Sequence, residues 1–227
     1  MTNTRVENAM TNRTSRDTGR STARRTGRRL PALLVAGALL ALAGCSATPG
    51  SGDGVNELAV RRADAMRLIE RAQQLAQQGR TDEAIRAYQE SITQSPSIAV
   101  AWNNLGELYM RQQQYADAVS SFERAGDLEP QDPRPPYNAG VAYQKNGWAQ
   151  DALGKFAEAL ERDAGYLPAL RGAVRSAEML NLADRPTLDR IKRATMTETD
   201  ETWRAYFERQ RFRVEHGLSQ QAEAEKS

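Results

Sequence analysis

Few side chains in this sequence can do covalent or acid–base chemistry. Of the 227 residues, one is a cysteine, Cys45, and one is a histidine, His216. A cysteine thiolate is a nucleophile, and an imidazole serves as an acid, a base or a metal ligand. We expect His216 to lie near the C-terminus of a helix with its ring in solvent. Cys45 is therefore the more informative of the two.

Groupings typical of an enzyme are not found elsewhere in the sequence. Asp and Glu together number 29, but they are scattered over expected helix surfaces and none stands at metal-ligand spacing with the histidine. The sequence also lacks a glycine-rich phosphate loop and a serine flanked as in a nucleophile elbow. We therefore expect no catalytic activity, no metal site and no cofactor.

Cys45 directly follows an uncharged apolar run, residues 30–43. A membrane-spanning helix needs about 20 apolar residues, so this shorter run is typical of the apolar core of a secretory signal. The run ends in Leu42-Ala43-Gly44 and then Cys45, which resembles the lipobox of bacterial lipoproteins. That resemblance implies that the Cys45 thiol is lipidated.

The lipobox also implies where the protein is located. Residues 1–44 are then a cleaved signal peptide, exported by the general secretory route because the arginine pairs lack the flanking pattern of twin-arginine export. Two or three acyl chains, at about 0.8 kcal/mol per buried CH₂, anchor the protein to a membrane of the cell envelope. Ser46 favours the outer membrane, facing the periplasm. Residues 45–56 are the lipidated cysteine and a flexible linker, and either Met1 or Met10 is the start.

Charge is unevenly distributed along the chain. The formal net charge is +2, yet the first 44 residues hold eight arginines and two acidic residues, which leaves −4 for the remainder. A protein that binds nucleic acid usually concentrates basic residues on its working domain. Because the basic surplus lies in the expected signal peptide, we do not expect a nucleic-acid partner.

A 34-residue period runs through the middle of the chain. Its central copy contains Trp102, Leu105, Gly106, Tyr109, Ala118, Phe122, Ala125 and Pro130, its downstream copy Ala139, Gly140, Tyr143, Ala152, Phe156 and Ala159, and its upstream copy Leu68, Ala72, Leu75, Ala84, Tyr88 and Pro96. The spacing resembles the tetratricopeptide repeat. This resemblance implies an all-α fold, a tetratricopeptide-type solenoid of helical hairpins with C-terminal capping helices.

The period sets the expected domain organisation. Three repeats and a degenerate fourth fill residues 57–182, followed by capping helices over 183–216 and a disordered tail over 217–227. The repeat helices are expected at 57–78, 81–94, 98–112, 115–128, 134–146, 149–163 and 167–180. Pro186 breaks the register, which indicates a new helix over 186–196 and a last one over 199–216.

The last expected helix carries an aromatic stripe that includes Trp203, Tyr206 and Phe207, with Val214 further along. The stripe has two interpretations. We favour a cap over the open end of the solenoid, because terminal repeats must be atypical to be soluble. The alternative is a surface that binds a partner or a second copy of the chain.

In the tetratricopeptide family the first helix of each pair lines a concave groove. The groove residues that the resemblance implies are Asn103, Asn104, Glu107, Arg111, Arg134, Tyr137, Asn138, Val141, Lys145, Arg171 and Arg175. Asn104 and Asn138 stand one period apart, and such an amide ladder can hold an extended peptide because a carboxamide both donates and accepts. A purely structural role for these asparagines is an equal alternative.

Charge also differs between the two sets of helices. The four first helices hold seven basic and three acidic residues, whereas the three second helices hold four basic and twelve acidic. A more positive groove favours an acidic segment or a free C-terminal carboxylate as ligand.

These features together predict a function. We expect a lipid-anchored scaffold or adaptor of the bacterial cell envelope that binds a protein or peptide. In layout it is similar to lipoproteins that assist secretin assembly, tight-adherence secretion or peptidoglycan-hydrolase recruitment, and the sequence does not choose among these. The alternative is a self-associating structural module that forms homo-oligomers through its terminal helices.

Overall fold

The computed structural model describes residues 52–226, and within that range it contains nine α-helices and no strand. The expected signal peptide, the lipidation site Cys45 and most of the expected linker lie outside the described residues. The helices are α1 (Gly52–Gln77), α2 (Thr81–Gln94), α3 (Ala99–Arg111), α4 (Tyr115–Leu128), α5 (Arg134–Lys145), α6 (Ala149–Arg162), α7 (Leu167–Met179), α8 (Arg185–Thr197) and α9 (Glu201–Ala224). The prediction of an all-α fold is confirmed.

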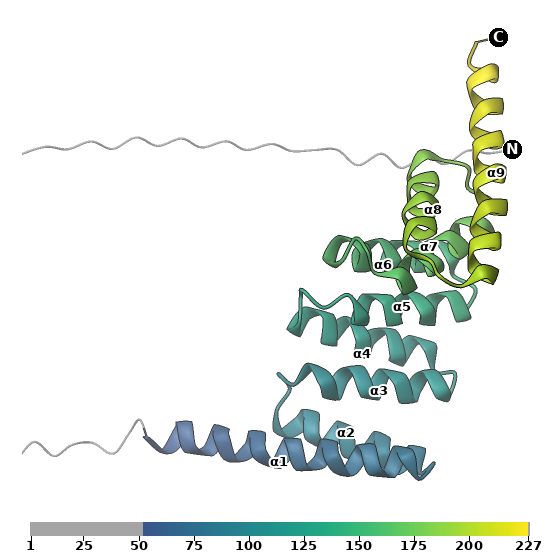
Figure 1. Ribbon diagram of the computed structural model, residues 1–227. Coiled ribbons are helices and arrows are strands. Elements are labelled where there is room, and N and C mark those ends of the chain that lie inside the picture. The colour runs from purple at the N-terminus through teal and green to yellow at the C-terminus, as the bar shows by residue number, and fades with distance from the viewer. Residues whose placement is uncertain (1–51, 227) are drawn as a thin grey trace, which may run out of the picture. The chain divides into compact units, whose positions relative to one another are not determined.

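The first seven helices form a stack of antiparallel hairpins (Figure 1). Helix α1 pairs with α2, α3 with α4 and α5 with α6, and each hairpin packs on the next through the contacts of α2 with α3, α4 with α5 and α6 with α7. Helices α2 to α8 begin and end within a residue of the expected positions. The 34-residue period thus marks one helical hairpin, as predicted.

In two of the hairpins the helices pack closely where a glycine faces a phenylalanine. Gly106 of α3 faces Phe122 of α4, and Gly140 of α5 faces Phe156 of α6; a Cβ atom added at either glycine would lie 2.7 Å from the ring. Carbon atoms in contact are normally about 3.5–4.0 Å apart. Only glycine allows these helices to approach so closely.

The turn inside each hairpin also follows the period. Gly79 and Gly147 have φ angles of +77° and +82°, and the residues at the matching positions, Gln113 and Asn181, have φ angles of +61° and +52°. A left-handed residue after the last turn is a common way to end a helix. Because Asn181 follows α7 in the same way, α7 has the turn geometry of a fourth first helix.

Helices α8 and α9 depart from the period and cover the end of the stack. Each follows an aspartate that caps its N-terminus. The Asp184 side chain accepts the backbone N–H of Thr187 (2.8 Å), and the Asp200 side chain accepts that of Trp203 (3.0 Å). Ile191, Phe207 and Val214 are fully buried, in one core cluster with Leu170 and Val174 of α7. The aromatic stripe therefore forms a cap, as we favoured.

The expected end of the last helix was wrong. Helix α9 continues through Ala224, whereas the sequence predicted that it would end at 216 and that 217–227 would be disordered. Gly217 lies so close to Ala183 that an added Cβ would be 2.6 Å from the Ala183 Cβ, and Leu218 packs against the core cluster. These two contacts stabilise a segment that its polar composition alone would leave unfolded.

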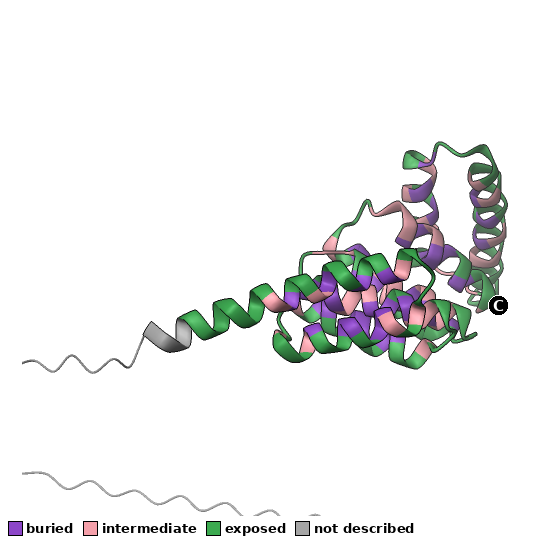
Figure 2. Ribbon diagram, turned by 90° about the horizontal axis from the view of Figure 1, so that it is seen from below, coloured by how far each residue is buried: buried purple, intermediate pink, exposed green. Residues whose placement is uncertain are grey.

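Helix α1 also begins earlier than expected, at Gly52 rather than at 57. Its first turns extend beyond α2 (Figures 1 and 2), and Leu58 and Val60 there are 69% and 53% exposed. Within residues 52–226 no helix is both long and apolar enough to cross a membrane.

Candidate partner-binding face

Helices α3, α5 and α7 carry the side chains that the sequence assigned to a groove, and we call the surface that these helices form with α1 the first-helix face. Its exposed members are Glu107, Arg111, Arg134, Lys145 and Arg175, and its half-buried members are Asn103, Asn104, Tyr137, Asn138, Val141 and Arg171. The predicted residues are thus present at the surface, but hydrogen bonds and ion pairs within the protein change what several of them can do.

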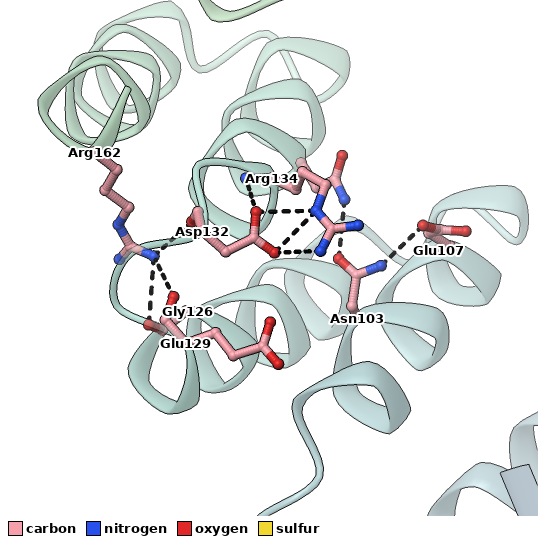
Figure 3. Close-up of polar contacts among 8 residues, drawn as sticks. Asn103, Glu107, Gly126, Glu129, Asp132, Arg134 and Arg162 are labelled. Atoms are coloured by element: carbon pink, nitrogen blue, oxygen red, sulfur yellow. Dashed lines mark hydrogen bonds and ion pairs between the residues drawn. The ribbon is translucent and has the colours of Figure 1, made fainter. Parts of the chain in front are cut away.

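The asparagines are bonded to one another and to their neighbours. Asn138 Nδ2 donates to Asn103 Oδ1 (3.0 Å), and Asn103 Nδ2 donates to Glu107 Oε1 (2.9 Å; Figure 3). Asn104 Nδ2 donates to the Tyr88 hydroxyl (3.1 Å). Asn138 therefore contacts Asn103, not Asn104, across the boundary between two repeats. Among the described residues nothing donates to the Oδ1 atoms of Asn104 and Asn138, so both remain acceptors for a ligand.

A hollow of about 250 Å³ lies between α3 and α5 on this face. It is lined by Ala99, Val100, Asn103, Asn104, Glu107, Ala125, Glu129, Asp132, Arg134 and Pro135. Its walls combine amides, carboxylates, one guanidinium and small apolar groups. Such a lining suits a polypeptide segment, which offers both backbone amides and apolar side chains.

Arg134 lines this hollow and is paired with Asp132 of the loop that precedes it. Its Nε atom lies 2.9 Å from both carboxylate oxygens of Asp132, and its Nη2 atom lies 2.7 Å from Oδ2 (Figure 3). Partial burial alone would raise the pKa of the Asp132 carboxyl, but its hydrogen bonds with Arg134 outweigh burial and the pKa is lowered. Asp132 thus pairs with Arg134, a cation that the sequence predicted to be available to a ligand.

Arg162 of α6 fixes the loop that carries Asp132, and the sequence did not predict this. Its Nη1 atom donates to the backbone carbonyls of Gly126 (3.4 Å), Glu129 (3.3 Å) and Asp132 (3.0 Å; Figure 3). Carbonyls at a helix C-terminus lack partners within the helix, and a guanidinium can satisfy several at once. One signal was available, because Arg162 is a basic residue in the last turn of its helix.

Arg171 links α7 to the turn between α8 and α9. Its Nε and Nη2 atoms donate to the Glu198 carboxylate at 2.8 and 2.7 Å, and its guanidinium lies 4.8 Å from the ring centroid of Trp203. The Glu198 side chain is completely buried and also accepts the backbone N–H groups of Thr199 and Asp200. The hydrogen bonds from Arg171 lower the pKa of Glu198. Arg171 therefore stabilises the cap and is not free for a ligand.

The cap also engages the end of α7. Glu178 accepts hydrogen bonds from the Tyr206 hydroxyl (2.7 Å) and from Gln210 Nε2 (2.6 Å), both on α9. Burial, and then the neighbouring Glu178 carboxylate, raise the pKa of the Tyr206 hydroxyl, so it remains a hydrogen-bond donor. Helix α9 thus binds the C-terminal end of α7 through Glu178, while Arg175 on the same helix stays exposed.

His216 takes no part in a site of this kind. Its ring is stacked on that of Phe212 at 6.3 Å between centroids, and it contacts Gln220. Over residues 52–226 the structure contains no group of three or more His, Cys, Asp or Glu side chains placed to hold a metal ion.

Part of the hairpin stack matches a known repeat family. The tetratricopeptide repeat family model matches residues 69–133, which run from the middle of α1 to the start of α5. These residues are similar to tetratricopeptide repeats. The same turn geometry recurs at 34-residue intervals as far as Asn181, beyond the matched residues.

The curated relatives are much longer proteins. Tetratricopeptide repeat protein 28 of Mus musculus is 28% identical over 146 residues, which cover 63% of this chain and 6% of the relative. Superkiller complex protein 3 of Homo sapiens is 24% identical over 122 residues, which cover 51% of this chain and 8% of the relative. The chain therefore matches only a small part of each relative, and the similarity is that of the repeat.

Solved structures share the fold. The MamA protein superposes with a TM-score of 0.59 at 18% identity, covering 72% of this chain and 87% of MamA. The first tetratricopeptide domain of Spaghetti (RPAP3), solved with an HSP90 peptide, superposes with a TM-score of 0.50 at 22% identity, covering 53% of this chain and 96% of that domain. These similarities confirm the prediction of a tetratricopeptide-type solenoid.

Proposed function

We propose that this protein is a lipid-anchored scaffold or adaptor of the bacterial cell envelope, and that it binds a segment of another protein on the first-helix face. A tetratricopeptide fold indicates a protein-interaction module. The observation that carries the choice of this face is the hollow between α3 and α5, which is lined by Asn104, whose Oδ1 atom accepts no hydrogen bond from the described residues.

The anchor in this proposal is Cys45. Its support is the lipobox-like Leu42-Ala43-Gly44-Cys45 after the apolar run, together with the basic residues that precede that run. Lipidation at Cys45 would hold the repeats at a membrane surface without a membrane-spanning helix. Outer-membrane sorting follows from Ser46 in the same proposal.

Photo-crosslinking in intact cells tests the binding face. A benzophenone amino acid replaces Glu107, which is exposed and lines the hollow, and the control replaces Gly154, whose Cβ position on α6 has nothing within 4 Å. We expect a crosslinked protein from position 107 and none from position 154. No adduct from position 107, or the same adduct from both positions, would refute the proposed binding face.

Self-association through the terminal helices is the second candidate, and one observation favours it. Met196 of α8 and Phe212 of α9 are 83% and 74% exposed. A benzophenone at position 212 should give an adduct of twice the chain's mass if copies pair through these helices. A different protein in that adduct would identify α9 as a partner-binding surface instead.

A further inference from the structure

The basic residues of the first-helix face fall into two classes. Arg134 and Arg171 are paired within the protein, with Asp132 and Glu198 respectively. Arg111, Lys145 and Arg175 are exposed, and no carboxylate of residues 52–226 lies within ion-pair distance of any of them. These last three, which we call the basic edge, are the cations of this face that remain available to a ligand.

The basic edge occupies the C-terminal ends of three successive first helices. Arg111 and Lys145 lie in the last turns of α3 and α5, one period apart, and Arg175 lies about one turn before the end of α7. Direct hydrogen bonds join these helices in sequence: Asn138 to Asn103 between α5 and α3, and Gln144 to Ser176 between α5 and α7. The three cations therefore line one side of a continuous surface.

The carboxylates nearest in sequence to the basic edge are occupied elsewhere. Glu107, one turn before Arg111, accepts from Asn103. Glu178, three residues after Arg175, accepts from Tyr206 and from α9's Gln210. A cation at a helix C-terminus is stabilised by the helix dipole. This stabilisation explains why a basic residue lies in the last turn of a helix. It leaves the side-chain N–H groups of the basic edge without an acceptor among the described residues.

The opposite side of the same face carries exposed apolar side chains. Met66 of α1 and Val100 of α3 stand one period apart and are 42% and 41% exposed. Val100 also lines the hollow. We call these two residues the apolar edge. Burying such side chains against a ligand removes apolar surface from water, which is favourable.

We propose that the partner segment is amphipathic along its length: an apolar side chain contacts the apolar edge, and acidic side chains pair with the basic edge. This inference rests on the proposed function, because it assigns a ligand to the same face. The amides of Asn104 and Asn138 lie between the two edges in sequence and meet the backbone of the segment.

The length of α3 sets the spacing that the segment needs. Val100 and Arg111 are eleven residues apart, which corresponds to about 16 Å along the helix at about 1.5 Å per residue. An extended chain covers that distance in about five residues at roughly 3.3 Å each. The apolar residue and the first acidic residue of the partner segment are therefore about five positions apart.

Fluorescence anisotropy with the purified full chain in a neutral detergent tests this inference. The probe is a labelled eight-residue peptide with leucine first, glutamate at its last three positions and serine or glycine between. One comparison peptide carries lysine in place of the three glutamates, and another carries serine in place of leucine. We expect the first peptide to bind at least tenfold more tightly than either comparison peptide at low salt.

Charge-reversal variants distinguish an effect of the basic edge on peptide binding from an effect of the protein's net charge. Arg111→Glu together with Lys145→Glu should weaken binding of the leucine–glutamate peptide at least tenfold. The control, Arg86→Glu with Arg209→Glu, changes net charge equally at exposed residues of α2 and α9 and should leave affinity within twofold. Met66→Ser together with Val100→Ser should reduce the affinity to that of the serine peptide.

Three results would overturn the inference: no binding of the leucine–glutamate peptide, equal or tighter binding of the lysine peptide, or the same loss in the control variant. Failure of the proposed function is distinguishable from these. If position 107 crosslinks to a partner whose binding is insensitive to Arg111→Glu with Lys145→Glu, the face is correct and the assigned ligand is wrong. If position 107 yields no adduct, the proposed function itself fails.

Discussion

The ring of Phe156 lies between two glycines, and replacing one of them by alanine should destabilise the array. A Cβ atom added at Gly172 of α7 would lie 2.5, 2.6 and 2.8 Å from three atoms of this ring. The ring is fully buried, so it must move by about 1 Å to restore a normal contact of about 3.5 Å. Overpacking of this kind costs about 1–3 kcal/mol.

Helix propensity acts in the opposite direction in the same variant. Alanine is favoured over glycine within a helix by about 1 kcal/mol. With overpacking near the upper end of its range, because the obstacle is a buried aromatic ring, Gly172→Ala should lower the free energy of unfolding by about 1–2 kcal/mol.

Gly154 of α6 provides the matched control, since nothing lies within 4 Å of its Cβ position. Gly154→Ala should therefore raise the free energy of unfolding by up to about 1 kcal/mol. The same chemical change thus has opposite signs at two helical glycines. Urea unfolding of the full chain, followed by circular dichroism, measures both, as shifts of the midpoint at constant slope.

A second substitution tests the cause. If the ring is the obstacle, Phe156→Leu should cost less in the Gly172→Ala background than in the wild-type protein, because the smaller side chain relieves the overlap. A Gly172→Ala variant that is stabilised as much as Gly154→Ala would refute the reasoning, since the close contact would then carry no energetic cost.

Three further predictions concern the anchor, the cap and a turn. Cys45→Ser should abolish palmitate labelling and leave the precursor uncleaved by the lipoprotein peptidase, and normal maturation would contradict the proposed anchor. Glu198→Gln should lower the free energy of unfolding by about 2 kcal/mol at pH 7, because it removes charge-assisted bonds to Arg171. The folded-state pKa of Glu198 lies below its ordinary value of 4.5, so its contribution is present above that pH and is lost on acidification, and the variant should lack this part of the acid dependence in urea titrations from pH 7 to 3. Gln113→Gly should raise the midpoint of thermal unfolding, because a left-handed conformation costs a residue other than glycine about 1–2 kcal/mol, and an unchanged midpoint would argue against that conformation at Gln113 (φ +61°).

The hairpin stack could be predicted from the sequence because one short pattern encodes both its contacts and its turns. Gly106 and Phe122 recur as Gly140 and Phe156, and each pair meets at the same distance. Local turn residues ended the helices where the sequence indicated. A repeat is predictable to this degree because each hairpin contacts mainly its neighbours, so local spacing determines long-range packing.

The state of the basic residues could not be predicted from the same pattern. Arg171 occupies a place that the repeat gives to a groove residue, yet its partner Glu198 lies 27 residues later, in a turn that follows no period. Asp132 neutralises Arg134 because of the local course of a loop, which composition does not specify. Counting charges by helix therefore indicated a basic surplus on the first helices. It did not show that two of these cations, Arg134 and Arg171, are already paired within the protein.

The length of α9 was missed for a related reason. Residues 217–227 are rich in Gln, Glu, Ala and Ser, which predicts disorder when the segment is considered alone. The contacts of Gly217 with Ala183 and of Leu218 with the core stabilise the helix there. Contacts between a tail and a loop more than thirty residues earlier have no signal in a single sequence.

The near identity of two successive hairpins means that this protein can change in size by gene duplication. An added Cβ at Gly106 would meet the Phe122 ring at 2.7, 2.8 and 3.0 Å, and at Gly140 it would meet the Phe156 ring at 2.7, 2.8 and 3.1 Å. A duplicated 34-residue unit inserted between them would pack on a hairpin with the same contact residues on both sides. The array can therefore lengthen in the middle. Its carboxyl end cannot grow in this way, because Arg171 and Glu178 of α7 are committed to the cap. Longer descendants of this protein are therefore expected to gain repeats ahead of α7 and to retain the α8–α9 ending unchanged.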